Sequence, residues 1–120
     1  MLADELYNAG DDEIQSDLAT TRDWLVRYNA SLGMATGERR TLLAERLGAA
    51  GVGSTIRPPF HCDYGFNIRL GAGVFLNFGC VILDVVEVSI GAGSVVTRDV
   101  PPGATVVGNP ARVRDASNAA

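Results

Sequence analysis

The strongest constraint on the fold of this chain is a six-residue repeat of aliphatic residues between positions 68 and 108. The spacing matches neither the 3.6-residue period of an α-helix nor the two-residue period of a simple β-strand, whereas hexapeptide repeats are typical of parallel β-helices. The repeat falls into two series separated by a two-residue shift. Their members are Leu70, Leu76, Ile82 and Val88, followed by Ile90, Val96 and Pro102.

This repeat predicts a mainly β solenoid in which three hexads form one triangular coil of roughly 18 residues. The aliphatic residues at the repeat positions are expected to point inward and to stack from coil to coil. Glycines directly follow three of the repeat positions; they are Gly71, Gly91 and Gly103. We expect them at the corners of the coils, where a larger side chain would collide with the neighbouring backbone or where φ must be positive. We expect the solenoid to run from about Ile56 to Val107.

The start of the chain has a different composition and predicts helices. A short helix is expected from Leu2 to about Asn8, and Asp11 or Asp12 can cap a longer helix. The longer helix has an apolar stripe, and Trp24 beside it is expected to be a packing residue. The stripe consists of Ile14, Leu18, Thr21, Leu25 and Tyr28.

These patterns divide the chain into three parts. Thr36 can cap a further helix that ends at Gly48. We expect a helical region at 1–50, a solenoid at 51–114 and a polar tail at 115–120. Because the helices cannot bury their apolar faces alone, they are expected to cover an open end of the solenoid.

Charge and hydropathy exclude several classes of partner. The formal net charge is −4 and all 10 basic residues are arginines, which disfavours a broad nucleic-acid surface but leaves enough arginines for a compact phosphate ligand. No apolar run approaches the roughly 20 residues that cross a bilayer. The acidic start does not resemble an export signal. We therefore expect a cytoplasmic protein without a membrane partner.

The two cysteines are expected to be buried free thiols. The separation of Cys62 and Cys80 equals one predicted coil, so the two are expected to be stacked neighbours on adjacent coils. In a reducing compartment such residues act as small hydrophobic side chains. His61 is adjacent to Cys62 and should point to the opposite face of a strand. No metal site is predicted.

Three stretches resemble the hexapeptide-repeat sugar O-acetyltransferases of the maltose and galactoside acetyltransferase group. They are MLADELYNAGDDEI at 1–14, IRPPFHCDYGFNIRLGAGVFLNFGCVILDV at 56–85 and SIGAGSVVTRDVPPGATVVGNPARV at 89–113. The resemblance implies a left-handed parallel β-helix, a homotrimer with active sites between subunits, and acetyl transfer from acetyl-CoA to a sugar hydroxyl. The left-handed sense comes from this resemblance and not from the periodicity.

The resemblance also implies residues for the sugar acceptor. Asp63 and Asn77 match positions that hold the sugar in the family, and Asp84 aligns beside another such position. Sugar hydroxyls are costly to bury without partners of this kind. The alternative for Asp63 and Asn77 is that they cap tight turns at the corners of the coils.

A second set of residues resembles the family's coenzyme site. Ala92 and Thr97 match backbone or hydroxyl contacts to coenzyme A. Arg98 and Arg112 match basic residues near its phosphates, and Arg114 lies one position from another family arginine. Guanidinium groups pair with two phosphate oxygens at once, so two or three arginines suffice.

The chain departs from the family pattern between Val88 and Ala92. Family members continue through roughly three more coils of about 18 residues, including a loop with a His-Pro pair, whereas here the flanking segments are fused at Ile90-Gly91. The lost histidine is the family's general base. His61 is the only histidine of this chain and is expected to be a packed or surface side chain, so no catalytic residue is assigned.

Three interpretations follow for the function. The chain is a sugar O-acetyltransferase, active or recently inactivated; or it is a trimeric scaffold or binding module without chemistry; or it is the shortened product of a longer gene.

Overall fold

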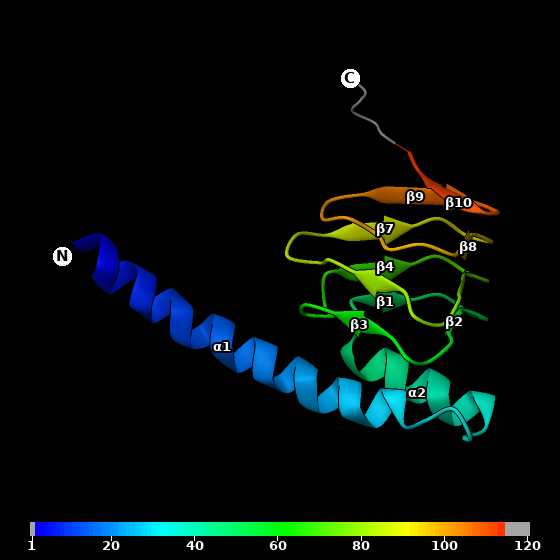
Figure 1. Ribbon diagram of the computed structural model, residues 1–120, viewed down its shortest axis with the longest axis horizontal. Coiled ribbons are helices and arrows are strands. Elements are labelled where there is room, and N and C mark those ends of the chain that lie inside the picture. Colours follow the sequence, from blue (N-terminus) through cyan, green and yellow to red (C-terminus); the bar gives the residue numbers. More distant parts are fainter. Residues whose placement is uncertain (1, 115–120) are drawn as a thin grey trace.

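The computed structural model of this protein describes residues 2–114, so the tail predicted at 115–120 lies outside the described residues. Two helices precede ten short strands. Helices α1 (Leu2–Asn29) and α2 (Thr36–Arg46) lie below a stack of coils, and α1 extends well beyond the stack (Figure 1).

Two details of the predicted helices are wrong. Helix α1 is continuous from Leu2 to Asn29, so neither Asp11 nor Asp12 caps a separate helix. Gly10 is tolerated inside α1 because a helical glycine costs only about 1 kcal/mol. In α2, Ala35 occupies the N-cap position without a side-chain hydrogen bond. Thr36 is the first helical residue and not the cap.

The buried face of α1 is centred on Trp24, which confirms its predicted packing role. Trp24, Tyr28 and Thr21 are buried, whereas Ile14 at the start of the predicted stripe is exposed. The Trp24 ring stacks on Tyr28 at 5.2 Å between centroids and meets Phe60 edge-on at 6.4 Å. Its indole nitrogen donates a hydrogen bond to the Leu42 carbonyl of α2 at 2.8 Å. Trp24 therefore joins the two helices to the first coil.

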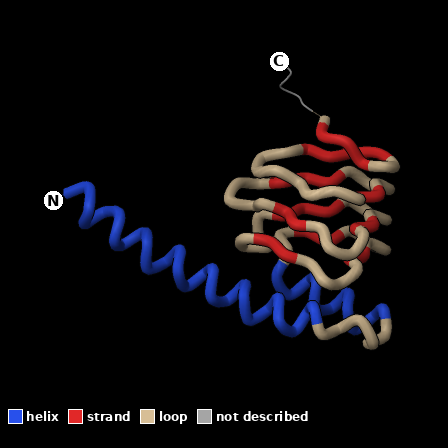
Figure 2. The backbone as a smooth tube through the Cα atoms, viewed as in Figure 1, coloured by secondary structure: helices blue, strands red, loops and turns tan. Residues whose placement is uncertain are grey.

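The strands form three sheets, and the chain passes from one to the next in turn (Figures 1 and 2). Sheet A has the order β1-β4-β7-β9-β10, sheet B the order β2-β5-β8, and sheet C the order β3-β6. All pairs are parallel except β9 with β10. The strands are β1 (Ala49–Ala50), β2 (Thr55–Ile56), β3 (His61–Cys62), β4 (Ile68–Leu70), β5 (Phe75–Leu76), β6 (Val81–Ile82), β7 (Val88–Ile90), β8 (Val95–Val96), β9 (Thr105–Gly108) and β10 (Ala111–Val113).

Each full coil is two residues longer than predicted, because Ala50 pairs with Leu70 and Leu70 pairs with Ile90. The additional two residues lie between sheets C and A. Ile82 and Ile90 are eight positions apart there, whereas the other two sides keep the six-residue spacing. The two-residue shift in the repeat is therefore a longer corner loop that recurs in each full coil.

The last coil is shorter than the others. Ile90 pairs with Val106, and Ile82 forms a bridge with Val100, so both steps are shorter than the step from Leu70 to Ile90. Val100 consequently occupies the buried position expected for Pro102, which is exposed. The other residues named for the repeat are buried; they are Leu70, Leu76, Ile82, Val88, Ile90 and Val96.

The longer coil also corrects the expected position of the cysteines. Cys62 pairs with Ile82 and not with Cys80, because the predicted stacking depended on the shorter coil. Both cysteines are free thiols. Burial raises the pKa of both thiols, and Asp84 and Asp63 raise that of Cys62 further. Neither thiol is therefore prepared to act as a nucleophile.

The helices cover the first coil, as expected. The Tyr28 hydroxyl donates to the Ile56 carbonyl. Asn29 exchanges two hydrogen bonds with the Phe60 backbone, at 2.9 and 2.8 Å. Helices α1 and α2 have 28 and 11 residues, and the longest described strand has four. The expectation of a mainly β chain thus applies to the coils, whereas helix predominates over strand in the described chain as a whole.

Within residues 2–114, no helix combines the length and apolar character needed to cross a membrane.

Candidate functional site

The corner between sheets B and C brings together residues from three successive coils. Ile56 pairs with Leu76, and Leu76 with Val96. Each strand residue is followed by a polar one, so Arg57, Asn77 and Thr97 form a row along this corner. Neighbouring strands are about 4.8 Å apart. We call this row and the residues next to it, Phe78 and Arg98, the B/C corner.

Asn77 and Thr97 are therefore neighbours in the stack. The Asn77 backbone nitrogen donates to the Val96 carbonyl at 2.9 Å, which fixes Asn77 beside the start of the Thr97 turn. The Asn77 side-chain oxygen accepts a bond from the Phe78 nitrogen at 3.0 Å. The Asn77 side-chain oxygen is therefore bonded within its own turn, and both turn capping and sugar binding stay predictions for this residue. The stacking also places a predicted sugar residue one coil from a predicted coenzyme residue.

Arg98 and Arg112 line one hollow of about 140 Å³ at the end of the stack opposite the helices. The floor is apolar, formed by Val96, Val100 and Val106. Arg112 reaches it because β10 folds back on β9. The remaining lining residues are Asp99, Ala111 and Val113.

The charges in this hollow fit a phosphate-bearing ligand. Within residues 11–114 the two ion pairs join Arg27 to Glu45 and Arg69 to Glu87, so neither Arg98 nor Arg112 has an acidic partner there. One carboxylate oxygen of Asp99 accepts a bond from the Val81 nitrogen at 3.0 Å. Two free guanidinium groups over an apolar floor suit the phosphates and an apolar part of coenzyme A.

The other predicted coenzyme residues lie elsewhere. Ala92 is exposed in the turn between β7 and β8, at the corner between sheets A and B. Arg114 follows β10, is exposed, and donates its backbone nitrogen to the Thr105 carbonyl at 2.6 Å. Neither lines the hollow with Arg98 and Arg112. The structure therefore brings Arg98 and Arg112 to one hollow, places Thr97 next to Arg98 but outside the lining, and leaves Ala92 at another corner.

Asp84 differs from its expected role at the sugar site. Its side chain is fully buried, at 0% exposure. One carboxylate oxygen accepts the backbone N–H groups of Asp63 and Tyr64, both at 2.9 Å, and the other accepts that of Asn67 at 3.2 Å. Asp84 therefore holds the preceding corner loop and is not available to a sugar. The sequence analysis selected Asp84 as a polar residue of the site but did not predict that its side chain is buried.

Asp63 begins the loop that Asp84 holds, at the corner between sheets C and A. Its side chain is half-buried. Partial burial, followed by the nearby Asp84 carboxylate, raises the pKa of the Asp63 carboxyl above its usual value. Asp63 is the accessible carboxyl of this pair, and it lies at the opposite end of sheet C from Asn77.

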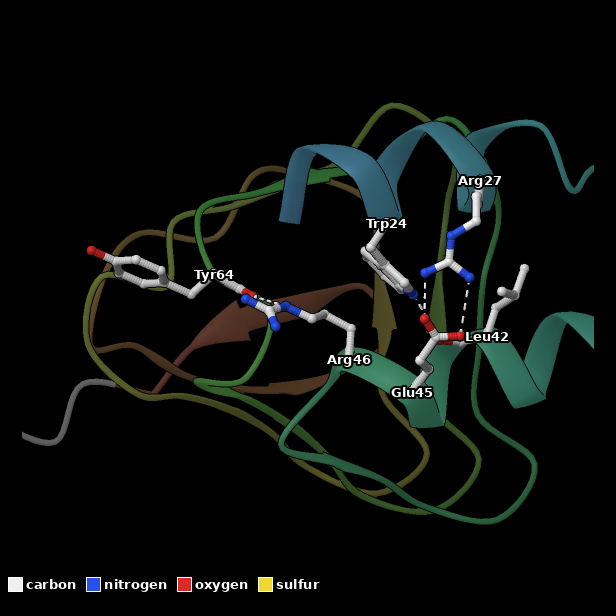
Figure 3. Close-up of polar contacts among 6 residues, drawn as sticks. All are labelled: Trp24, Arg27, Leu42, Glu45, Arg46 and Tyr64. Carbon is white, nitrogen blue, oxygen red and sulfur yellow. Dashed lines mark hydrogen bonds and ion pairs between the residues drawn. The ribbon is translucent and has the colours of Figure 1, made fainter. Parts of the chain in front are cut away.

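The same loop is held from the helical side by Arg46 and Thr21. The Arg46 Nε and the Thr21 hydroxyl donate to the Tyr64 carbonyl at 2.8 and 2.9 Å, and Arg46 also donates to the Thr21 oxygen at 3.0 Å. Figure 3 shows Arg46 extending from α2 to Tyr64, beside the contacts of Trp24 with Leu42 and of Arg27 with Glu45. The sequence analysis did not select Arg46, because nothing in its local pattern indicates a distant carbonyl partner.

His61 is separate from the Arg98–Arg112 hollow. It is exposed on β3 in the first coil and lines a different surface hollow of about 470 Å³ with residues of α1. The lining contains no carboxylate that could orient the imidazole as a base. The residues that the structure describes also include no group of three His, Cys, Asp or Glu side chains placed to hold a metal ion.

Comparison with known proteins places the chain in a family. The profile of the maltose acetyltransferase hexapeptide capping motif matches residues 1–51. Nodulation protein L of Rhizobium meliloti (strain 1021) is 41% identical over 174 residues, which cover 95% of this chain and 95% of that protein. The chain belongs to the hexapeptide-repeat sugar O-acetyltransferases. The family resemblance stated from the three sequence stretches is thereby confirmed.

The chain is shorter than both of these relatives. Nodulation protein L of Rhizobium leguminosarum bv. viciae is 59% identical over 96 residues, and the chain spans about half (50%) of that relative's length. In the R. meliloti comparison, 95% of the 120 residues here corresponds to 174 residues there, so about 60 residues have no counterpart in this chain. At the coil length from Leu70 to Ile90, the difference is about three coils, in agreement with the segment predicted to be missing.

Solved structures share the fold of this chain. A hexapeptide-repeat acetyltransferase from Vibrio cholerae O1 biovar eltor, complexed with acetyl coenzyme A, has a TM-score of 0.59 and 24% identity; the match covers 85% of this chain and 87% of that one. A galactoside acetyltransferase in complex with coenzyme A has a TM-score of 0.60 and 20% identity, covering 83% and 80%. At these identities the similarity concerns the fold alone.

Proposed function

We propose that this protein binds acetyl-CoA and a sugar acceptor, and that it transfers acetyl groups slowly or not at all. The observation that carries the proposal is the hollow lined by Arg98 and Arg112, one coil from Asn77 and with no histidine in its lining. The solved relatives support the ligand, since one is complexed with acetyl coenzyme A and a galactoside acetyltransferase with coenzyme A.

Each of the predicted sugar and coenzyme residues has a defined role in this proposal. Arg98 and Arg112 pair with coenzyme phosphates, and the Thr97 hydroxyl bonds the coenzyme beside them. Ala92 and Arg114 contribute further coenzyme contacts only if the assembled trimer brings them near the hollow. Asn77 bonds sugar hydroxyls next to the coenzyme residues, and Asp63, at the opposite end of sheet C, bonds the same sugar only if the assembled trimer brings the two corners together. Asp84 fixes the loop of Asp63. Acetyl-CoA, when bound, supplies an activated thioester.

The slow chemistry follows from the absence of a base. A sugar hydroxyl is a poor nucleophile at neutral pH, and a positioned base contributes typically 10²–10⁴-fold. Losing it costs roughly 3–5 kcal/mol of barrier lowering, at 1.36 kcal/mol for each factor of ten. His61 is the only histidine of the chain and lines a different hollow. The missing coils also remove part of the groove that aligns the reactants.

The winding, assembly and location of the protein also belong to this proposal. The coils are expected to wind in the left-handed sense of the family, with the helical region at 1–50 and the solenoid at 51–114. A homotrimer is supported by exposed apolar side chains on the loop between sheets C and A, namely Leu83, Val85 and Val86 at 39%, 53% and 53% exposure. The protein is expected in the cytoplasm.

Titration calorimetry with coenzyme A tests the binding proposal. Arg98→Gln and Arg112→Gln should each weaken binding, and the affinity of the unmodified protein should fall as salt rises because phosphate pairing drives it. Arg69→Gln is the matched control, since Arg69 is exposed but already paired with Glu87 at 3.3 Å. Salt-independent binding, or equal loss in all three variants, would contradict the proposal.

The alternative function is a trimeric scaffold that binds neither ligand. The exposed apolar loop at Leu83, Val85 and Val86 favours this alternative over a monomeric binding module. Sedimentation at micromolar concentration, combined with the calorimetry, separates the two. A trimer without coenzyme affinity supports the scaffold, and a 12.6 kDa species excludes the trimer.

A further inference from the structure

We propose that the hollow of about 470 Å³ between α1 and β3 binds an acidic sugar. We call it the α1/β3 hollow. In this site the carboxylate of the sugar pairs with Arg22, and the apolar face of the sugar ring packs on Leu25 and Val26. The inference goes beyond the proposed function, because none of the predicted coenzyme or sugar residues lines this hollow.

The first observation is the size and composition of the hollow. Its volume lies within the range of roughly 300–1,000 Å³ that is typical of small-molecule sites. Such sites combine an apolar surface with a few placed polar groups, and this hollow has both. The lining residues are Arg22, Leu25, Val26 and Asn29 of α1 and His61 of β3.

The second observation is the charge of the hollow. Within residues 11–114, Arg22 belongs to neither of the two ion pairs. The acidic neighbours of the next arginine on α1, Arg27, are Glu45 and Asp23, and among the described residues no acidic side chain lines the hollow. A guanidinium without an acidic partner can pair with both oxygens of a carboxylate. The site therefore favours an anionic ligand over a neutral one.

The third observation concerns the rest of the ligand. The exposed imidazole of His61 offers a ring nitrogen for a hydrogen bond. The apolar surface is limited to Leu25 and Val26, and Val26 is 72% exposed. A long alkyl chain would find too little apolar surface here. A sugar ring, which has an apolar face and hydroxyl groups, uses both kinds of lining residue.

The fourth observation is that the walls of the hollow are fixed to each other. The Asn29 side chain exchanges two hydrogen bonds with the Phe60 backbone, at 2.9 and 2.8 Å, and Phe60 directly precedes His61. The Phe60 ring meets Trp24 and Tyr28 edge-on, each at 6.4 Å between centroids. These contacts hold β3 against α1, so a ligand does not have to order the site when it binds.

The α1/β3 hollow is separate from the proposed coenzyme hollow. His61 of β3 pairs with Val81 of β6. The Val81 nitrogen donates a hydrogen bond to Asp99, which lines the coenzyme hollow. Strand β6 therefore lies between the two hollows, and two strand spacings amount to about 10 Å. Each site can be tested without occupying the other.

Nuclear magnetic resonance of the His61 imidazole tests the inference at fixed pH, because His61 is the only histidine of the chain. The probes are glucuronate, glucose and acetate, so the ring and the carboxylate are also tested apart. Glucuronate should shift the imidazole signals at lower concentration than either of the others. Arg22→Gln should weaken glucuronate binding by about 5-fold or more, which corresponds to the upper end for an exposed ion pair.

A second variant tests the charge without removing Arg22. Val26→Glu places a carboxylate one helical turn from Arg22, where it competes for the guanidinium, and should also weaken glucuronate binding. Arg27→Gln is the matched control, since it removes the same charge from α1 at a guanidinium that Glu45 holds outside the lining. It should leave glucuronate binding unchanged. Thermal unfolding of every variant checks that the protein remains folded.

The outcomes separate this inference from the proposed function. Equal binding of glucose and glucuronate, or equal loss in Arg22→Gln and Arg27→Gln, would show that the carboxylate does not pair with Arg22. Acetate or hexanoate binding as tightly as glucuronate would show that the ring is not recognised. Either result overturns the inference. If glucuronate leaves the His61 signals unchanged while coenzyme A binds, the inference is wrong and the proposed coenzyme binding stands; the reverse result supports the inference and contradicts the proposed function.

Discussion

Replacing Asp84 with asparagine tests how the loop of Asp63 is held. The buried Asp84 carboxylate accepts three backbone N–H groups, at 2.9, 2.9 and 3.2 Å, and the side chain has 0% exposure. Hydrogen bonds to a charged group are each worth about 1.5–3 kcal/mol. Asparagine keeps one acceptor oxygen but turns an NH₂ group toward one buried N–H. We expect a loss of about 2–4 kcal/mol, one such bond plus part of a desolvation penalty.

The assay is urea unfolding at a fixed protein concentration, because a trimer would make the apparent stability depend on concentration. Asp99→Asn is the matched control. Asp99 is exposed and accepts one backbone N–H, from Val81 at 3.0 Å, so its replacement should cost less than about 1 kcal/mol. Equal losses in the two variants would refute the assignment of Asp84 as the residue that holds the loop.

Three further predictions concern stability. Gly71→Ala should lower the free energy of unfolding by about 1–3 kcal/mol, because a Cβ atom there would lie 2.7 Å from a backbone nitrogen of the next coil. In the control variant Gly37→Ala in α2, the added Cβ meets nothing within 4 Å, so stability in the same urea assay should be unchanged or higher. Burial raises the pKa of Tyr28 to about 12, so the stability that depends on the neutral Tyr28 side chain is intact below pH 10 and is lost between pH 10 and about 12. Ultraviolet titration should show that this tyrosine ionises at a higher pH than a free one. A normal midpoint near 10 would contradict the burial. The hydrogen bond from Arg27 lowers the pKa of Glu45, so its stabilisation is present above the ordinary carboxyl pKa and disappears as the pH falls below it, and Glu45→Gln should remove this part of the pH dependence of melting.

The hexad repeat is sufficient to predict the coils but not their length. The inward positions from Leu70 to Val96 are buried as expected, because burial of one face fixes the pattern of a strand. The longer coil does not follow from the sequence, because the two-residue shift before Ile90 resembles a single interruption and not a recurring loop. The expected position of Pro102 is wrong for a related reason, since the final coil shortens its corners.

The candidate site is predictable in part. Arg98 and Arg112 follow from the resemblance, and the structure brings them to one hollow. The burial of Asp84 could not be predicted, because an aspartate in a corner gives no sign of whether it accepts bonds from the loop of another coil. Arg46 and Arg57 escape selection for the same reason. Their partners, the Tyr64 carbonyl and the Phe78 ring, are distant in sequence and become neighbours only when the chain folds.

The most direct test of the proposed function is acetyl transfer measured on protein that has been shown to bind coenzyme A. Release of free thiol from acetyl-CoA is followed with and without maltose, in the unmodified protein and in His61→Ala. We predict salt-dependent coenzyme binding together with thiol release that maltose does not increase. Rapid maltose-dependent release that persists in His61→Ala would contradict the account, because it would require a catalytic base that neither the sequence nor the hollow lined by Arg98 and Arg112 provides.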